Sequence, residues 1–445
     1  MLTAALAASA EGYQVNTLSA KQEGMGSVGV AMKLGAESQM FNPAAMVFSN
    51  KTFELSGAIS AISAHASATH EGIKYKTDND ISTPLNVATS FRIYDNLYGG
   101  IALYTPFGSG INWGTHWPGA VLNQKATIRQ FTLQPTLSYK ILPNLSVGAG
   151  LMIAWGNVDL DKGLLTGSSL NKLMGALGMP ESAMYAPGTT PASVNLKGNA
   201  KIALGVNVGA MWDITDQWTL GASFRQKLTM TVEKGNAVVS YSGAAESMLS
   251  PVLDNLNSTN FRASLPCPYV FTAGISYKPI PNLILAFDAQ LNGWSTYKYL
   301  DIAFDDLAAF DQHLKKDYKN AMTYHIGAQY GITPRLDLRA GLMIDTNPCN
   351  LEYYNPETPG QTRIDPSVGF SFRPTKRLAI DMSFMYVHGV GADNATGQYE
   401  DFVYKIAAQQ NPALPGMLGL NPVEKFTADY KVHAFIPAIG FTYSF

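Results

Sequence analysis

The 445-residue sequence contains little charge and no long apolar run. Asp, Glu, Lys and Arg make up 14% of the residues, against roughly 25% in a typical soluble domain. A transmembrane helix needs about 18 or more consecutive apolar residues, and no stretch of the sequence approaches that length. Because 46% of the residues are hydrophobic, the chain suits contact with lipid, and it would have to cross a membrane as β-strands.

Cysteine and an excess of charge of one sign are also nearly absent. The formal net charge is -2 and no long basic run occurs, so we expect no nucleic-acid partner. Cys267 and Cys349 form no C-x-x-C motif, which argues against a zinc or thioredoxin-type site and leaves one disulfide or two free thiols. The histidines are scattered without a Ser-His-acid arrangement. We therefore expect no enzyme, no metal site and no cofactor.

The most regular pattern is an alternation of apolar and polar residues with a period of two, which predicts strands with one apolar face. It is clearest at 336–344, 364–372 and 378–386. A related phrase combines a large or aromatic residue, a turn rich in Pro, Asn and Asp, and an alternating run. Short turns of this chemistry join antiparallel neighbours. The phrase occurs at 91–103, 139–151, 211–224, 277–289, 330–342 and 372–384.

The turns and connections predict a closed sheet. Six turns join twelve strands, one more strand opens near Thr52 and another closes at Phe445, so we expect fourteen. Short turns on one side and long connections on the other are typical of outer-membrane barrels, as are aromatic residues at strand ends. We expect the long connections near 106–124, 158–197, 235–267, 293–320, 346–361 and 389–430. The fold class is thus all-β, a 14-stranded antiparallel transmembrane β-barrel.

The N-terminal residues are expected to form other structures. Residues 1–10 read as a residual signal peptide or a disordered terminus, because a short apolar run ends in small residues. Residues 24–29, "GMGSVG", match a dinucleotide-binding pattern, but the polar segment before them is not the hydrophobic strand that such a site requires. Glycines that permit a compact fold in a narrow space are the better interpretation.

The segment from Gly12 to Asn50 resembles the N-terminal hatch of the FadL/TodX family of outer-membrane hydrophobic-compound transporters. The family's Gly-aromatic-Gln opening is similar to Gly12-Tyr13-Gln14, and its Asn-Pro-Ala ending is similar to Asn42-Pro43-Ala44. Further similar motifs, such as "YTPFGSGINWGTHWPGA" at 104–120, extend over nearly the whole chain. The resemblance implies a hatch at 11–48 that plugs a barrel at 49–445, in the outer membrane of a Gram-negative bacterium.

The resemblance also implies a passive transporter that takes a hydrophobic molecule from an external groove to an inner pocket and out through the barrel wall. Helical stripes in two long connections are candidates for the groove, although these faces would equally pack on each other as a cap. The groove candidates are Leu170, Leu173, Met174, Leu177, Met248, Leu249, Val252, Leu253 and Leu256. For the lateral opening, glycines and a proline typical of an interrupted strand occur at Gly99, Gly100 and Pro106.

The inner pocket would combine hatch residues with basic residues of the wall. Strand parity directs Arg225, Lys227 and Arg339 into the lumen, but it also directs Asp288, Asp337 and Asp381 there, so an ion-pair network that stiffens the barrel is the favoured alternative. The hatch residues could equally form the core of the plug. The pocket candidates are Tyr13, Val15, Leu18, Met40, Phe41, Asn42, Pro43, Ala44, Met46, Arg225 and Lys227.

The substrate stays open among fatty acids, aromatic hydrocarbons and other lipid-like compounds. The alternatives to transport of such compounds are a plugged polar porin and a surface adhesin that the barrel anchors. The expected partners are the hydrophobic ligand, outer-membrane lipid with lipopolysaccharide, and the barrel assembly machinery, which the resemblance implies would read the terminal Phe445. A monomer is expected.

Overall fold

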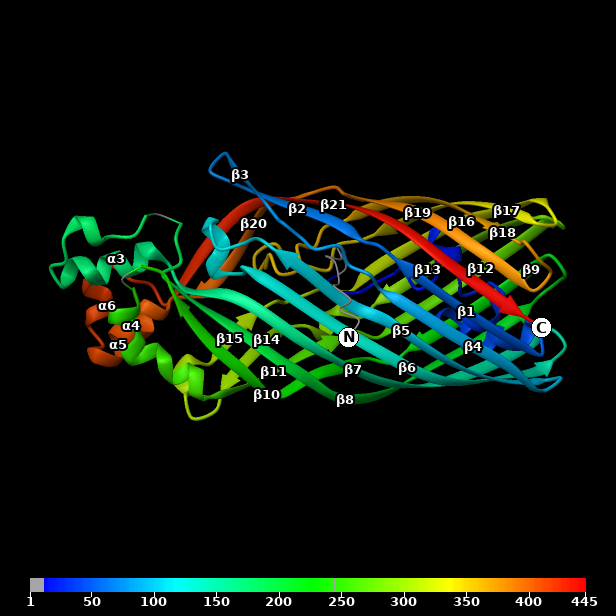
Figure 1. The fold of residues 1–445 in the computed structure, drawn as a ribbon, viewed down its shortest axis with the longest axis horizontal. Helices are drawn as coiled ribbons and strands as arrows, with labels where there is room; N and C mark the ends of the chain where they lie inside the picture. The colour runs from blue at the N-terminus through cyan, green and yellow to red at the C-terminus, as the bar shows by residue number, and fades with distance from the viewer. Residues whose placement is uncertain (1–11, 187, 244) are drawn as a thin grey trace.

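A computed structural model describes residues 12–186, 188–243 and 245–445 of the protein. The expected signal remnant at 1–10 lies outside these residues. The strands close into one ring of fourteen antiparallel members, three of which consist of two collinear strands (Figure 1). In ring order they are β1 (Phe53–Ser60) with β2 (Ser63–His70), β4 (Leu85–Tyr94), β5 (Leu97–Asn112), β6 (Lys125–Leu142), β7 (Leu145–Leu165), β8 (Ala192–Asp213), β9 (Trp218–Arg225) with β10 (Leu228–Tyr241), β11 (Asn260–Cys267) with β12 (Val270–Ile280), β13 (Leu283–Asn292), β16 (Ala321–Thr333), β17 (Leu336–Asp345), β18 (Arg363–Phe372), β19 (Leu378–Gly389) and β21 (Val423–Ser444).

The ring is closed by β21, which pairs with β19 on one side and with β1 and β2 on the other. The predicted alternation holds in the wall. On β17, Asp337 and Arg339 are buried while Leu338 is exposed, and on β18 the exposed residues include Val368 and Phe370. The prediction of a 14-stranded antiparallel barrel is confirmed.

Several strands are longer than the sequence pattern predicts. β5, β6, β7 and β8 continue well into the segments that were expected to be loops, and β7 and β8 pair from Leu145↔Trp212 as far as Leu165↔Ala192. The predicted connections at 106–124 and 158–197 are therefore wrong in extent. Backbone hydrogen bonds continue beyond the apolar band because each long strand has an equally long neighbour to pair with.

Helices and short strands gather at one end of the barrel, opposite the short turns and the C-terminus (Figure 1). They form an extracellular cap, since long connections of outer-membrane barrels face outward. The helices are α3 (Gly167–Ala176), η3 (Pro118–Val121), η4 (Glu181–Ala183), α4 (Ala245–Leu253), η5 (Asp254–Ser258), η6 (Trp294–Thr296), η7 (Ala308–Phe310), α5 (Phe402–Gln410) and α6 (Leu414–Met417). The short strands are β3 (Ile73–Lys76), β14 (Tyr299–Phe304), β15 (Gln312–Lys315) and β20 (Ala392–Glu400).

The N-terminal segment lies inside the ring and folds into short helices. These are α1 (Ala20–Glu23), η1 (Gly35–Glu37), α2 (Ser38–Phe41) and η2 (Pro43–Phe48). The glycines of 24–29 let this segment touch the wall: a Cβ on Gly24 would lie 2.8 Å from Gly369 Cα, and a Cβ on Gly341 would lie 2.6 Å from Gly26 Cα. The motif that mimics a dinucleotide site therefore serves backbone-to-backbone packing, because only glycine permits so close an approach.

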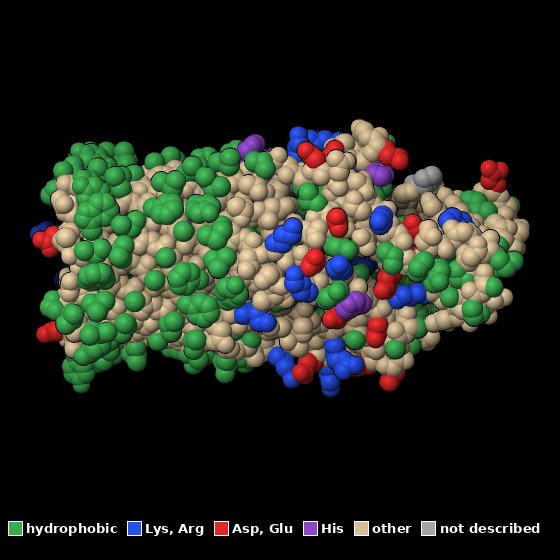
Figure 2. Space-filling view, turned by 180° about the vertical axis from the view of Figure 1, so that it is seen from behind, with side chains coloured by type: hydrophobic (Ala, Val, Ile, Leu, Met, Phe, Trp, Pro, Cys, Tyr) green, Lys and Arg blue, Asp and Glu red, His purple; other side chains and the backbone are tan. Residues whose placement is uncertain are grey.

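The outer surface separates apolar and charged side chains along the barrel. Hydrophobic side chains cover the end away from the helical cap, whereas Lys, Arg, Asp and Glu gather in a band toward the cap (Figure 2). Among the described residues, no helix has the length and apolar content needed to span a membrane. Cys267 and Cys349 are both buried and free, which decides between the two alternatives that the sequence left open.

Candidate functional site

The wall holds the hatch mainly through hydrogen bonds to hatch backbone atoms. The Asn42 side-chain amide donates to Val30 O at 2.7 Å and to Ala210 O at 3.0 Å, and its oxygen accepts the Ala44 amide. Arg225 Nη2 donates to Met40 O at 2.7 Å. Asn42 thus connects the hatch backbone at Val30 and Ala44 with strand β8 of the wall. The proline that follows starts η2, where its missing N–H removes no helical bond.

A buried carboxylate on β13 makes a second attachment. Asp288 Oδ2 accepts the amides of Gly29 and Val30 at 2.6 and 3.0 Å. On the opposite side of the hatch, Ser138 and Ser146 both donate to Ala44 O, at 3.0 and 2.8 Å. Together these contacts satisfy hatch backbone groups that would otherwise be buried without partners.

One hatch carboxyl is buried and takes part in no ion pair among the described residues. Glu23 on α1 is fully buried and accepts hydrogen bonds from Ser60 Oγ and Ser383 Oγ, both at 3.1 Å. Burial raises the pKa of Glu23 from 4.5 to about 8, although the two hydroxyl donors act in the opposite direction. The docked hatch therefore favours the protonated acid at neutral pH.

The structure brings together part of the predicted inner pocket. One cavity, of about 40 Å³, is lined by five of the candidates: Val15, Leu18, Met40, Phe41 and Arg225. This volume holds roughly one water molecule, so no hydrophobic ligand fits in this conformation. The remaining candidates are placed elsewhere: Pro43, Ala44 and Met46 pack against the wall below, Asn42 anchors the hatch, and Tyr13 belongs to an aromatic cluster.

The expectation that Lys227 points into the lumen is wrong. Lys227 lies in the break between β9 and β10 and is exposed, and the buried positions that follow are Leu228 and Met230. The break shifts the inward parity from odd to even residues, since the chain inserts extra residues between two collinear strands. Arg225 precedes the break and points inward as predicted.

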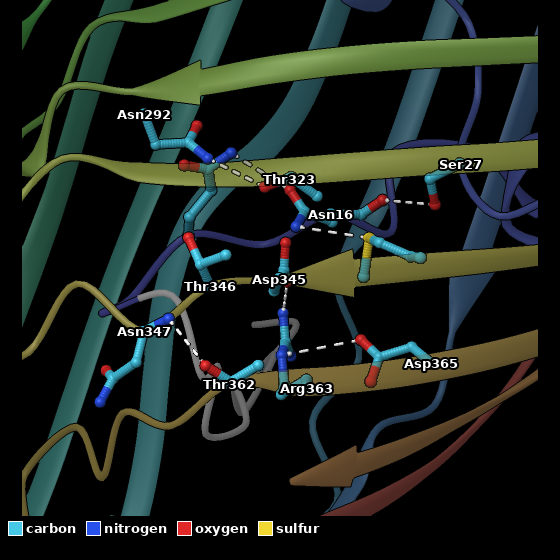
Figure 3. Close-up of polar contacts among 12 residues, drawn as sticks. Asn16, Ser27, Asn292, Thr323, Asp345, Thr346, Asn347, Thr362, Arg363 and Asp365 are labelled. Atoms are coloured by element: carbon cyan, nitrogen blue, oxygen red, sulfur yellow. Dashed lines mark hydrogen bonds and ion pairs between the residues drawn. The ribbon is translucent and has the colours of Figure 1, made fainter. Parts of the chain in front are cut away.

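Ion pairs fill the lumen beside the hatch, in line with the predicted network. Arg339 on β17 lies 3.4 Å from Asp381 and 3.8 Å from Asp337. A second cluster, which the sequence did not reveal, places Arg363 between Asp345 and Asp365, with Arg363 Nε 3.6 Å from Asp365 Oδ2 (Figure 3). Charged groups paired in this way tie neighbouring strands together across the interior.

An edge of β5 loses its strand partner partway along. β4 pairs with β5 only as far as Asn86↔Tyr104, and the β5–β6 register shifts between Tyr104 and Phe107. In the described part of the chain, the N-terminal segment occupies the vacated edge: Val15 N donates to Pro106 O at 2.9 Å and Gly108 N to Tyr13 O at 2.7 Å. We call this edge of β5, residues 106–111, the β5 seam.

The seam corrects the prediction for the lateral opening. Gly99 pairs with Phe91 and Leu137, and Gly100 pairs with Ser90 and Thr136. These two glycines thus lie where β5 is paired on both sides. The prediction that the strand is interrupted at Gly99 and Gly100 is wrong. Only Pro106 lies at the irregularity. Because Pro106 has no N–H to contribute, the ladder changes register next to it.

An aromatic cluster lies next to the seam. The Tyr13 ring lies 5.0 Å from that of Trp294 and 6.2 Å from those of Phe107 and Tyr297. Trp294 Nε1 and the Tyr297 hydroxyl are buried without a hydrogen-bond partner among the described residues. Sequence reasoning identified Tyr13 but missed the others, because Phe107 on β5 and the connection that holds Trp294 and Tyr297 are far apart in the chain. Two unpaired donors beside apolar rings fit a mainly apolar molecule with one polar group.

The candidate groove residues form the core of the extracellular cap. The most buried of them have exposed fractions of 3% or less, and α3 packs against α5. Leu173, Met248 and Val252 are half-buried, and Leu177 is 65% exposed. The packing matches the capping alternative, and a groove would require these helices to separate. The buried members are Leu170, Met174, Leu249, Leu253 and Leu256.

No group of three or more His, Cys, Asp or Glu side chains in the described part of the chain is placed to hold a metal ion. The side chains that converge on the hatch instead bind backbone and one another. A closed ring of tilted strands with an apolar outer band, a plugged lumen and a seam in the wall defines the molecule as a plugged transmembrane β-barrel of outer-membrane type.

Comparison with known proteins gives the family. Residues 1–445 match the family described as Outer membrane protein transport protein (OMPP1/FadL/TodX). The chain belongs to this family, whose members are transporters and channels of the outer membrane rather than enzymes, and it is an outer-membrane β-barrel protein.

Relatives and solved structures agree with this assignment. Outer membrane protein P1 of Haemophilus influenzae is 23% identical over 299 residues, which cover 65% of this chain and 62% of that protein. The chain thus spans less than two thirds of the length of that relative. A FadL homologue of Pseudomonas aeruginosa has the same fold, with a TM-score of 0.78, 18% identity and coverage of 98% and 100%. The toluene transporter TodX of Pseudomonas putida has a TM-score of 0.68, 15% identity and coverage of 98% and 99%.

Proposed function

We propose that the protein is a passive outer-membrane transporter of hydrophobic small molecules that releases them sideways through the β5 seam. The observation that carries this proposal is the position of the N-terminal segment. Residues 13–15 pair with β5 where β4 ends, so the segment closes the wall and also borders the inner cavity. One displacement of this segment would open the seam and enlarge the cavity together.

A lateral route suits an apolar cargo better than an aqueous pore does. A hydrophobic molecule gains free energy when it leaves water for lipid, and the seam lies in the wall rather than at the periplasmic end. Hatch backbone and the ion pairs of Arg339 and Arg363 occupy the lumen beside the cavity. Passage straight through would require these buried pairs to separate, which costs several kcal/mol.

The substrate class follows from the surroundings of the seam. The aromatic rings of Tyr13, Phe107, Trp294 and Tyr297 offer apolar faces, and two unpaired donors lie among them. Similar folds include the toluene transporter TodX and the monoaromatic hydrocarbon channel CymD. We infer that the cargo of this chain is likewise a small hydrophobic compound, with one polar group able to accept a hydrogen bond from Trp294 or Tyr297.

The gate is tested by locking the N-terminal segment to the seam. Gln14 and Phe107 face each other as an antiparallel bridge, and the flanking bonds make them a non-hydrogen-bonded pair. Such pairs have Cα atoms ~4.5 Å apart, which suits a disulfide. The double variant Gln14→Cys/Phe107→Cys is prepared with Cys267→Ala and Cys349→Ala to remove the native thiols.

We expect the oxidised lock to abolish uptake of hydrophobic compounds into liposomes and a reductant to restore it. The single variants Gln14→Cys and Phe107→Cys are matched controls, and the uptake rate of each should be the same with and without the reductant, whatever the loss of the Phe107 ring does to that rate. The natural cargo is sought by mass spectrometry of compounds that co-purify with the protein. Undiminished uptake through the oxidised lock would refute the gate.

Uptake, ligand-binding and conductance measurements on the purified protein also distinguish hydrophobic transport from the two alternative functions, a polar porin and an adhesin. A plugged polar porin would bind no apolar compound and would conduct ions when the hatch at residues 11–48 is deleted. A surface adhesin would show no uptake of either kind, whatever the redox state of the lock. Either result would refute hydrophobic transport.

A further inference from the structure

A polar pocket of about 390 Å³ lies on the outer face of the wall, across β5 to β8 and β10. Its lining residues Thr127 and Arg129 on β6 alternate with Ala126 and Ile128, which are buried in the interior core. The pocket therefore opens away from the lumen. Register shifts interrupt the β7–β8 and β8–β10 ladders beside it, and such irregularities bend a wall locally.

The pocket has an excess of unpaired positive charge. Three cations of the lining, Lys125, Arg129 and Lys234, take part in no ion pair among the described residues, against one such carboxylate, Asp80. Lys197 is paired with Asp159 at 3.2 Å. Arg129 Nε is buried without a hydrogen-bond partner. A guanidinium donor without a partner, in the same pocket as two unpaired ammonium groups, favours a phosphate ligand, because charge-assisted bonds to phosphate oxygens are strong.

Asparagine side chains in the lining could bind a sugar in addition to the phosphate. Side-chain amides both donate and accept hydrogen bonds, as sugar hydroxyl groups do. No hydrogen bond of the described residues involves the side-chain amides of Asn157, Asn199 or Asn236. A volume of about 390 Å³ lies within the ~300–1,000 Å³ typical of small-molecule sites. The asparagines that line the pocket are Asn79, Asn112, Asn157, Asn199 and Asn236.

The depth of the pocket places it at the outer-leaflet headgroups. On β6, Phe131 follows Arg129 by two residues on the same face, and its ring stacks on Trp155 at 6.0 Å. From Phe131 down to the exposed Tyr139, the strand rises about 20 Å at ~3.3 Å per residue and a tilt of ~40°. This distance accounts for most of the ~25 Å apolar band of such barrels. The pocket therefore lies just above the aromatic girdle, at the end that carries the cap.

We propose that this pocket binds the phosphorylated glucosamine headgroup of a lipid A molecule in the outer leaflet. Arg129, Lys125 and Lys234 bind the phosphate, and the asparagines bind the sugar hydroxyl groups. The acyl chains lie on the apolar strip below, which includes Trp155 and Leu204. The site does not depend on the proposed transport function, since it lies outside the lumen.

Native mass spectrometry of the delipidated protein in detergent, titrated with bis-phosphorylated lipid A, tests the proposal. The variant Arg129→Gln/Lys234→Gln should bind lipid A at least about tenfold more weakly than the unmodified protein, equivalent to ~1.4 kcal/mol. The matched control Lys74→Gln/Lys76→Gln removes the same charge from exposed positions of β3. It should bind as the unmodified protein does. Heat-modified migration on gels verifies that each variant is folded.

A gain-of-affinity variant keeps the test decisive if the double variant does not fold. Asp159→Asn removes the carboxylate that pairs with Lys197, so it should bind lipid A several-fold more tightly, because a further cation then faces the phosphate. A purely structural role of these residues would not predict tighter binding.

Three other ligands test whether the pocket recognises lipid A itself rather than any phosphate, sugar or acyl chain. Dephosphorylated lipid A and phosphatidylglycerol should each bind at least about tenfold more weakly than bis-phosphorylated lipid A. Soluble glucosamine 1-phosphate should not compete at equimolar concentration, since it lacks acyl chains. The proposal is overturned if any of these three probes matches lipid A, or if the double variant retains full affinity.

Discussion

Replacing Glu23 with glutamine is expected to remove a pH dependence from hatch docking. Glu23 titrates near pH 8 in the docked hatch, where burial raises its pKa, and near 4.5 when the hatch exposes it to water. Because the docked pKa is raised, docking is most favourable below pH 4.5 and loses stability as the pH rises toward 8. Above pH 8 the loss is complete.

The magnitude follows from the two pKa values. Between pH 5 and pH 8 the free energy of hatch opening should fall by about 3 kcal/mol, since each pH unit in this window contributes at most ~1.4 kcal/mol. This corresponds to an opening constant that rises on the order of 10². The side chain of Glu23→Gln is nearly isosteric with the protonated acid and does not ionise, so the variant should lose the part of the pH dependence that Glu23 contributes. Any pH dependence that remains comes from other hatch groups such as Glu37, whose pKa burial also raises.

Hydrogen exchange of the hatch amides in nanodiscs measures this opening, after correction for the intrinsic pH dependence of exchange. The control is Glu246→Gln, at an exposed position of α4, which should behave as the unmodified protein. Equal pH dependence in the unmodified protein and in Glu23→Gln would refute the argument, as would an opening constant in the unmodified protein that does not change with pH.

Three further outcomes follow from the packing. Gly341→Ala should loosen the hatch by ~1–3 kcal/mol through overpacking against Gly26, seen as added ion conductance, whereas Gly416→Ala, with open space around its Cβ, should change nothing. Arg339→Met should destabilise the barrel by roughly 3–5 kcal/mol in detergent melting, because it leaves the buried carboxylate of Asp381 without an ion-pair partner. An unchanged melt would contradict this. Leu170→Ala should destabilise the packing of the cap by about 2–5 kcal/mol and speed its proteolysis. Leu177→Ala, at an exposed position, should not change the proteolysis rate. Equal cleavage rates of the two variants would show that the cap is not packed as described.

The wall could be predicted from local pattern alone. Alternation at 336–344 and 364–372 determines which face of each strand meets lipid, because successive side chains of a strand point to opposite faces. The pattern needs no knowledge of neighbouring strands, and the structure confirms it at Leu338 and Val368. The hatch could be predicted only through the resemblance of Gly12-Tyr13-Gln14 and Asn42-Pro43-Ala44 to a known family.

Local pattern failed where the ring changes register. The inward parity of Arg225 could not be carried to Lys227, because β9 and β10 are separate strands with a break between them. Gly99 and Gly100 suggested an interruption that lies instead beyond Tyr104. Glycine and proline indicate where a strand can be irregular, but the pairing with neighbours decides where it is.

The sequence by itself determined the class of protein, because low charge content, a period of two and short turns that alternate with long connections are together typical of an outer-membrane barrel. Only the tertiary structure decided the seam, the aromatic cluster beside it and the outer pocket. Each combines residues from strands and connections far apart in the chain, such as Tyr13 with Trp294 and Arg129 with Lys234. Their proximity depends on how the ring closes and where its register shifts, and these are properties of the pairing between strands rather than of any one strand.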